Sequence, residues 1–258
     1  MSLFNAVILG LVQGLTEFLP ISSSGHIFLL ERWMGLVGNM DFTLWLHLGS
    51  LIAVVLYFRR DIMQMILGTL QMIQKKQANV QGIYTLKLLT ATFATVPTAL
   101  LMLKFFPYSE LSLRVVGITL LLTAVLIVFA ERARRSEQSL SWPLVIVLGL
   151  VQGLAIVPGI SRSGLTIAIL ILLGISRQLA ARTSFLLAIP TILGAGIYSY
   201  IDQGERFTNL GIFELTAVAV AAISAYVAIA WMMRWVEGRW IYFAYYCVAL
   251  GVIVLFLG

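Results

Sequence analysis

Long apolar stretches separated by short polar segments cover most of the chain. Six of these stretches each contain 16 to 19 consecutive residues without a charged side chain. A helix needs roughly 20 residues to cross a bilayer, so each stretch is long enough once a few flanking residues are added. The pattern therefore predicts six transmembrane helices, at Phe42–Phe58, Leu88–Phe106, Leu113–Ala130, Thr183–Ile201, Phe213–Met233 and Trp240–Gly258.

Two further apolar regions, 3–34 and 142–175, are interrupted near their middle. The first is broken by the segment FLPISSSG and the second by VPGISRSG. Proline removes a helical hydrogen bond, and serine and glycine favour turns. Each arm beside a break has about a dozen residues, or roughly 18 Å, which is too short to cross a bilayer. We therefore expect two re-entrant helical hairpins.

The two interrupted regions are copies of each other. Residues 9–26 and 148–165 agree at 11 of 18 positions at a constant offset of 139, without a gap. LGLVQGL is identical in both copies, and ISSSG in the first aligns with ISRSG in the second. A match of this length indicates an internal duplication.

The composition is that of an integral membrane protein. Of the 258 residues, 60% are hydrophobic and 11% are charged, whereas a soluble domain is about one quarter charged. Continuous apolar stretches favour helices over the alternating strands of a barrel. The single cysteine, Cys247, lies in the last stretch and is predicted to be a small core residue. No lysine or arginine precedes Arg32, so we expect the first segment to be retained and not cleaved as a signal peptide.

The net charge of +6 is interpreted as a topology signal and not as a nucleic-acid-binding surface. With both interrupted regions as hairpins, the lysines and arginines outside the motifs divide 12 to 4 between the two sides of the membrane. If the second region crossed once, the division would be 9 to 7. The hairpins then enter from opposite faces, with Arg132–Arg135 as a cytoplasmic anchor. This predicts one all-α membrane domain, 1–258, built from inverted repeats 1–130 and 131–258.

The first hairpin tip carries ionisable and polar groups that are costly at membrane depth. Gln13 and Glu17 are four residues apart and share one helical face, so their oxygens could hold a divalent cation; a helix–helix hydrogen bond is the other interpretation of Gln13. The serines that follow the break are expected to cap the second arm, and a capped helix start also binds anions. His26 is predicted to be a nucleophile or a general acid–base. The candidates here are Gln13, Glu17, Ser22, Ser23, Ser24 and His26.

The second tip, PGISRSGLT, has the composition of a phosphate-binding loop. Glycine allows close approach of the backbone, hydroxyls donate hydrogen bonds, and the guanidinium of Arg162 matches phosphate oxygens. The candidates here are Gly159, Ser161, Arg162, Ser163 and Thr166. In the aligned copies Glu17 faces Ile156, and His26 faces Leu165, so the two tips are expected to be unlike halves of one site. Gln152 is interpreted as structural, and the role of His47 is left open.

An acid, a histidine, hydroxyls and an arginine beside a cation fit phosphoryl transfer from a pyrophosphate. Because the site lies among membrane helices, the rest of the substrate is expected to be a lipid. A transporter or flippase for a lipid phosphate is the competing hypothesis, since inverted repeats with broken helices are common in transporters. A purely structural scaffold explains neither the buried charges nor the divergence of the two copies.

These residues resemble those of the bacitracin-resistance-type undecaprenyl pyrophosphate phosphatases, integral membrane enzymes of bacteria. LVQGLTEFLPISSSGH is similar to the family motif (Glu/Gln)-x-x-x-Glu with its serine, glycine and histidine tail, and PGISRSGLT is similar to Pro-Gly-x-Ser-Arg-Ser-x-x-Thr. HLGSLIAVVLYFRRD and SFLLAIPTILGA are also similar to family segments. The resemblance runs essentially from end to end.

The resemblance implies hydrolysis of a polyprenyl pyrophosphate carrier to its monophosphate, which recycles the carrier for peptidoglycan synthesis. It implies a divalent cation, Mg²⁺ or Ca²⁺, and a location in the bacterial inner membrane with the site open to the periplasm. The lipid substrate and the bilayer are the expected partners, and whether the chain forms a homodimer is left open.

The resemblance also implies roles for individual residues. Glu17 and Gln13 would serve the metal or the pyrophosphate, and His26 with Ser22 or Ser23 would be the nucleophile or acid–base pair. Phosphate would be bound by Arg162 together with Ser161, Ser163 and Thr166. Many family members carry glutamate at the position of Gln13. Glutamine cannot act as a base, so that role falls to Glu17 or His26.

Overall fold

The computed structural model describes residues 2–36, 40–107, 111–133, 138–203 and 211–257. Within these ranges the chain forms helices and connecting loops, with no strand. The helices are α1 (Leu3–Phe18), α2 (Ser23–Trp33), α3 (Met40–Tyr57), α4 (Arg59–Lys75), α5 (Val80–Phe105), α6 (Leu113–Arg132), α7 (Trp142–Gln152), the 3₁₀ turn η2 (Gly153–Ile156), α8 (Arg162–Leu172), α9 (Arg177–Gln203), α10 (Ile212–Trp235) and α11 (Ile241–Leu257).

Four helices, α5, α6, α9 and α10, are long and apolar enough to cross a membrane. Helix α3 qualifies together with α4, although the two are bent by 77° where they join. Helix α11 has 17 residues and belongs with the shorter apolar helices. The described part of the chain therefore contains four or five membrane-capable helices where the sequence predicts six, and the protein is a multi-pass membrane protein.

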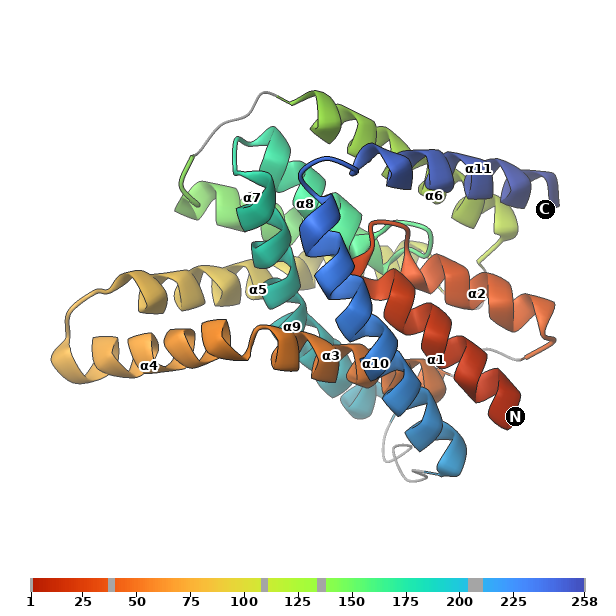
Figure 1. The fold of residues 1–258 in the computed structure, drawn as a ribbon, viewed down its shortest axis with the longest axis horizontal. Coiled ribbons are helices and arrows are strands. Elements are labelled where there is room, and N and C mark those ends of the chain that lie inside the picture. The colour runs from red at the N-terminus through yellow and green to blue at the C-terminus, as the bar shows by residue number, and fades with distance from the viewer. Residues whose placement is uncertain (1, 37–39, 108–110, 134–137, 204–210, 258) are drawn as a thin grey trace.

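Helix α4 is an element that the sequence pattern did not predict. It forms, with the first half of α5, a helical hairpin that projects from the rest of the molecule (Figure 1). Its exposed apolar residues recur at helical spacing, at Met63, Ile66, Leu67, Leu70 and Ile73. The basic anchor predicted at 132–135 lies mostly outside the described residues, as does Arg206.

Both interrupted regions are broken where the sequence predicts. In the first, α1 ends at Phe18 and α2 begins at Ser23; in the second, α7 and η2 end at Ile156 and α8 begins at Arg162. Ser22 has a φ of 69° and Gly159 a φ of 94°, so each turn contains one residue in the left-handed region. Figure 1 shows the two breaks meeting near the middle of the molecule.

The two halves of the chain pack reciprocally. Helix α1 packs against α10 of the second half, and α7, its duplicate, packs against α5 of the first half. In both contacts the glycines of the repeated LGLVQGL segment lie against the partner backbone. A Cβ atom on Gly14 would lie 2.4 Å from the Ala221 carbonyl oxygen, and one on Gly153 would lie 2.7 Å from that of Thr95. Small residues allow this close approach of membrane helices.

Replacing Gly14 by alanine is therefore expected to lower the free energy of unfolding in detergent by about 1–3 kcal/mol, because overpacking a tight contact is destabilising. The melting temperature should fall accordingly. The matched control is Gly194→Ala in α9, where an added Cβ meets no atom within 4 Å. That change is expected to be neutral or stabilising, by roughly 0.5–1 kcal/mol, because alanine favours a helix over glycine. Equal melting temperatures for the two variants would contradict the close α1–α10 contact.

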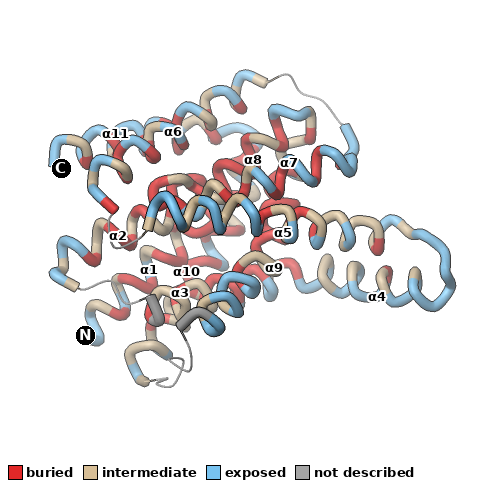
Figure 2. Tube along the Cα trace, turned by 180° about the vertical axis from the view of Figure 1, so that it is seen from behind, coloured by how far each residue is buried: buried red, intermediate tan, exposed pale blue. Residues whose placement is uncertain are grey.

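The buried residues concentrate where the two tips meet, and the projecting α4 is mostly exposed (Figure 2). The largest apolar cluster includes Phe18 at the end of α1 and Phe185 on α9, whose rings pack edge to face with centroids 5.2 Å apart. Cys247 is fully buried, as predicted for a small core residue. Glu17 is thus buried, whereas Ser23 at the first tip stays partly exposed.

Candidate active site

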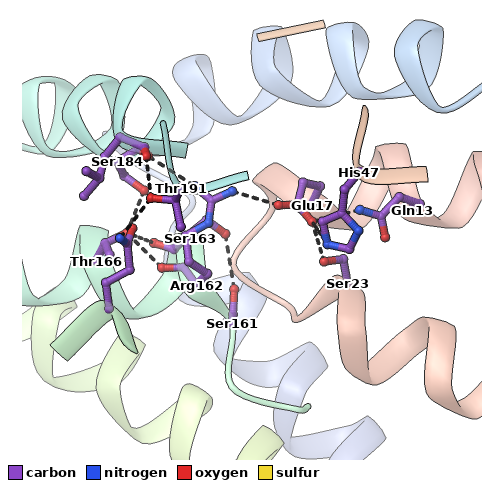
Figure 3. Close-up of polar contacts among 12 residues, drawn as sticks. Gln13, Glu17, Ser23, His47, Ser161, Arg162, Ser163, Thr166, Ser184 and Thr191 are labelled. Carbon is purple, nitrogen blue, oxygen red and sulfur yellow. Dashed lines mark hydrogen bonds and ion pairs between the residues drawn. The ribbon is translucent and has the colours of Figure 1, made fainter. Parts of the chain in front are cut away.

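An ion pair joins the two hairpin tips. Arg162 Nη2 lies 2.7 Å from Glu17 Oε1, across 145 positions of the sequence (Figure 3). The Glu17 and Arg162 side chains are only 5% and 14% exposed. The structure therefore brings the predicted acid of the first copy and the predicted arginine of the second copy into one site.

The other carboxylate oxygen, Glu17 Oε2, faces three further side chains. Ser23 Oγ donates a hydrogen bond to it over 2.6 Å, and Gln13 Nε2 donates another over 2.9 Å. His47 Nε2, from α3, lies 3.7 Å from the same oxygen. A hydroxyl at this distance from a carboxylate matches a nucleophile beside its base.

Two helices begin at the site. The hydroxyl of Ser22 caps α2 by accepting a hydrogen bond from the Gly25 amide, and that of Ser161 caps α8 by accepting one from the Gly164 amide. The positive ends of both helix dipoles therefore lie at the tips, next to Arg162. This arrangement favours an anion with several negative charges, such as a pyrophosphate.

Hydrogen bonds hold the two tips in register. Ser22 Oγ also accepts a hydrogen bond from the Gly159 amide, 3.1 Å away, and Ser163 Oγ donates one to the Leu19 carbonyl over 3.0 Å. Gly159 has no room for a side chain, because a Cβ there would lie 1.9 Å from Thr119 Oγ1. The Ser22 hydroxyl therefore accepts hydrogen bonds from two backbone amides, whereas the Ser23 hydroxyl donates one to the Glu17 carboxylate.

Two threonines of α6 support the second tip. Thr119 Oγ1 donates to the Pro158 carbonyl over 2.7 Å, and Thr123 Oγ1 donates to that of Gly159 over 3.0 Å. Thr123 Oγ1 also accepts a hydrogen bond from the Ser161 amide. These hydroxyls satisfy backbone groups that the break in the helix leaves without helical partners.

The guanidinium of Arg162 is held from a second side by α9. Its Nη1 donates to the Ser184 carbonyl over 3.2 Å, while Thr166 Oγ1 lies 2.6 Å from Ser184 Oγ (Figure 3). Thr166 also donates to the Arg162 carbonyl. The hydroxyls of Ser161, Ser163 and Thr166 are thus all hydrogen-bonded to other groups of the protein. Phosphate binding by them, and by Ser24 and Gly159, stays a prediction.

His26 contacts α11 and not the Glu17 carboxylate. Its Nδ1 lies 2.7 Å from the Ser22 carbonyl oxygen and its Nε2 lies 2.6 Å from the hydroxyl of Tyr246. The imidazole with a direct approach to Glu17 is that of His47, whose role the sequence left open. Gln152, the duplicate of Gln13, donates to Thr95 and Thr191, as expected for a structural amide.

Comparison with known proteins agrees with the resemblance seen in the two motifs. Residues 6–253 match the family model described as bacitracin resistance protein BacA. The chain belongs to the BacA family. The match includes both hairpin tips and every predicted site residue.

Curated relatives align with this BacA chain over nearly all of its length. An undecaprenyl-diphosphatase of Kineococcus radiotolerans is 40% identical, over 98% of this chain and 93% of its own. One of Carboxydothermus hydrogenoformans is 37% identical, and one of Methanobrevibacter smithii is 36% identical, each over 100% of this chain and 98% of its own.

Several residues of this BacA site could not be identified from the sequence. Thr119, Thr123 and Ser184 lie inside apolar helices, where a hydroxyl commonly bonds only to its own helix. Nothing in the sequence around these residues indicates that they also form hydrogen bonds to a hairpin tip. Tyr246 lies in an aromatic-rich segment that also fits a membrane-interface belt, so only the fold reveals its contact with His26.

Proposed function

We propose that this BacA-family chain hydrolyses undecaprenyl pyrophosphate, or a related polyprenyl pyrophosphate, to the monophosphate and inorganic phosphate. The observation that carries the proposal is the position of the Glu17 carboxylate. One of its oxygens accepts a hydrogen bond from the Ser23 hydroxyl, and the other accepts one from the Arg162 guanidinium. A nucleophile, its base and a cationic phosphate ligand are thus combined between two helix N-termini. The names of the relatives support the same reaction. The product would return the lipid carrier to cell-wall synthesis.

In the first step Ser23 Oγ attacks the terminal phosphorus and its proton passes to Glu17 Oε2. The bond from that phosphorus to the bridging oxygen breaks, and the lipid monophosphate leaves. Arg162 and the two helix ends offset the charge on the phosphoryl oxygens. Water then attacks the phosphoserine, Glu17 returns its proton to the departing Ser23 oxygen, and His26 takes the proton lost by the water.

A divalent cation, Mg²⁺ or Ca²⁺, would be held by Glu17 and by Gln13, whose Oε1 is buried without a hydrogen-bond partner. The described residues contain no cluster of three or more histidine, cysteine or acidic side chains. Glu17 and Gln13 would supply two oxygen ligands, which fits a cation that enters with the pyrophosphate, since Mg²⁺ often binds one or two carboxylates and substrate phosphates. When bound, such a cation would neutralise phosphate charge.

For the membrane arrangement we propose six spans with two opposed re-entrant hairpins, related as inverted repeats 1–130 and 131–258. The reciprocal packing of α1 on α10 and of α7 on α5 supports this proposal. The cell location would be the bacterial inner membrane, with the site open to the periplasm. The competing transporter hypothesis has no support in the names of the relatives.

The deciding experiment measures phosphate release from a polyprenyl pyrophosphate by the purified protein with Mg²⁺ or Ca²⁺. Ser23→Ala is expected to reduce kcat by at least about 10³-fold, because no nucleophile remains beside Glu17. Ser22→Ala removes the acceptor of two amides, so it is expected to lower the melting temperature and to reduce kcat by only about tenfold.

A wild-type protein that releases no phosphate, but moves lipid across a proteoliposome membrane, would replace the enzyme proposal with the transporter hypothesis. Normal turnover by Ser23→Ala would instead remove only the serine from its role and leave His26 as the nucleophile. Detection of a phosphorylated peptide containing Ser23 after rapid quenching would support the two-step reaction.

A further inference from the structure

Helix α11 lies beside the first hairpin tip at two adjacent residues. The Tyr246 hydroxyl lies 2.6 Å from His26 Nε2, and the buried Cys247 Sγ lies 3.6 Å from the Pro20 carbonyl oxygen. Helix α11 also packs along α6, whose threonines hold the second tip. The α6–α11 pair therefore contacts both tips of the site.

The two hydrogen bonds of His26 fix the state of its ring. A carbonyl oxygen only accepts, so the contact with Ser22 requires the proton of the neutral imidazole to be on Nδ1. Its Nε2 then carries a lone pair, to which the Tyr246 hydroxyl donates. The two rings are nearly parallel, with an interplanar angle of 9° and centroids 5.6 Å apart. Both the tautomer and the orientation of the imidazole are therefore set.

We propose that Tyr246 holds the neutral His26 imidazole with the Nε2 lone pair on its own hydroxyl, and that this hydroxyl gives its proton to Nε2 while it takes the proton lost by the water. This proposal rests on the proposed function, in which His26 accepts a proton during hydrolysis of the phosphoserine. Without the tyrosine hydroxyl the imidazole keeps its Ser22 contact but loses the partner that fixes the direction of Nε2. Misplaced proton acceptors lower the rate of the chemical step more than substrate binding.

Tyr246 and its neighbour Tyr245 form a matched pair for the test. Tyr245 is 62% exposed and its ring packs on Tyr242, away from His26. Tyr246→Phe keeps the ring that stacks on His26 and removes only the hydroxyl. It is expected to reduce kcat by about tenfold with KM within about twofold of wild type. Tyr245→Phe is expected to leave both values unchanged.

The chain has two histidines, so ¹⁵N-labelled imidazoles give a direct second measurement. In the wild type the Nδ1 of His26 is expected to be protonated and its Nε2 to be a hydrogen-bond acceptor. Tyr246→Phe should shift the His26 Nε2 resonance and leave that of His47 unchanged, because His47 Nδ1 bonds independently to the Thr43 carbonyl. Added to His26→Ala, the tyrosine change should cause no further loss of kcat.

An unchanged His26 resonance in Tyr246→Phe would overturn the proposal, as would a shifted resonance with wild-type kcat. A loss of kcat that is equally large in the His26→Ala background would also overturn it, since Tyr246 would then act on something else. If the wild type releases no phosphate, the proposed function fails and the NMR measurement alone decides whether Tyr246 fixes His26.

Discussion

Glu17→Gln is expected to abolish phosphate release, with a loss of kcat of at least about 10³-fold, the scale of losing a general base. Glutamine keeps the size of the side chain but cannot take the proton of Ser23. The change also leaves the Arg162 guanidinium, with a side chain only 14% exposed, without its counterion. A buried arginine without a partner is costly, so the melting temperature should fall as well.

The matched control for Glu17→Gln is Glu237→Gln, the same substitution at an exposed position after α10. It is expected to keep wild-type kcat and stability. Rates should be normalised to folded protein, measured by thermal melting in the same detergent. A folded Glu17→Gln protein with more than about one tenth of wild-type kcat would contradict the assignment of Glu17 as the base.

Arg162→Lys is expected to reduce kcat by about 10²–10³-fold, although the positive charge is retained. The guanidinium contacts Glu17 through Nη2 and the Ser184 carbonyl through Nη1, which a single ammonium group cannot reproduce in the same geometry. The remaining donors of the planar group are the ones that would meet phosphate oxygens. Phosphate release at saturating substrate measures the effect.

Arg177→Lys is the matched control for this change. Arg177 is similarly enclosed and contacts the Glu131 carboxylate and two carbonyl oxygens, but at the C-terminal ends of α6 and α10. We expect it to lower the melting temperature without changing kcat of the folded protein. Equal losses of kcat in both arginine variants would indicate that Arg162 acts only through the stability of the fold.

The sequence predicted the parts of the fold that follow from local chemistry. The breaks at Pro20 and Gly159 were predictable because proline, serine and glycine cannot continue an apolar helix. Glu17 and Arg162 could be assigned in advance to one shared site, because charges at membrane depth are costly and each of the two duplicated tips carries one of them. Helix α4 was missed because its apolar face, from Met63 to Ile73, is flanked by arginines and lysines and is shorter than a span.

Contacts between helices that are distant in the chain could not be predicted from local patterns. The sequence places His26 nearer to Glu17 than His47, yet the imidazole beside the Glu17 carboxylate comes from α3. That exchange depends on how α3 packs against α1 and α10, which no short motif encodes. Tyr246 lies 220 positions from His26, and one tyrosine among several in α11 has no distinguishing signal.

The reciprocal packing of the halves also constrains how the protein is made. The glycine face of α1 is synthesised well before its partner α10, since Ser224 and Gly10, which meet across this contact, are 214 positions apart. The Glu17 carboxylate has no Arg162 until α8 has been made, and α1 has no helix to cover its glycines until α10 has been made. The first hairpin therefore reaches its final place only after α10 has been made and has entered the bilayer.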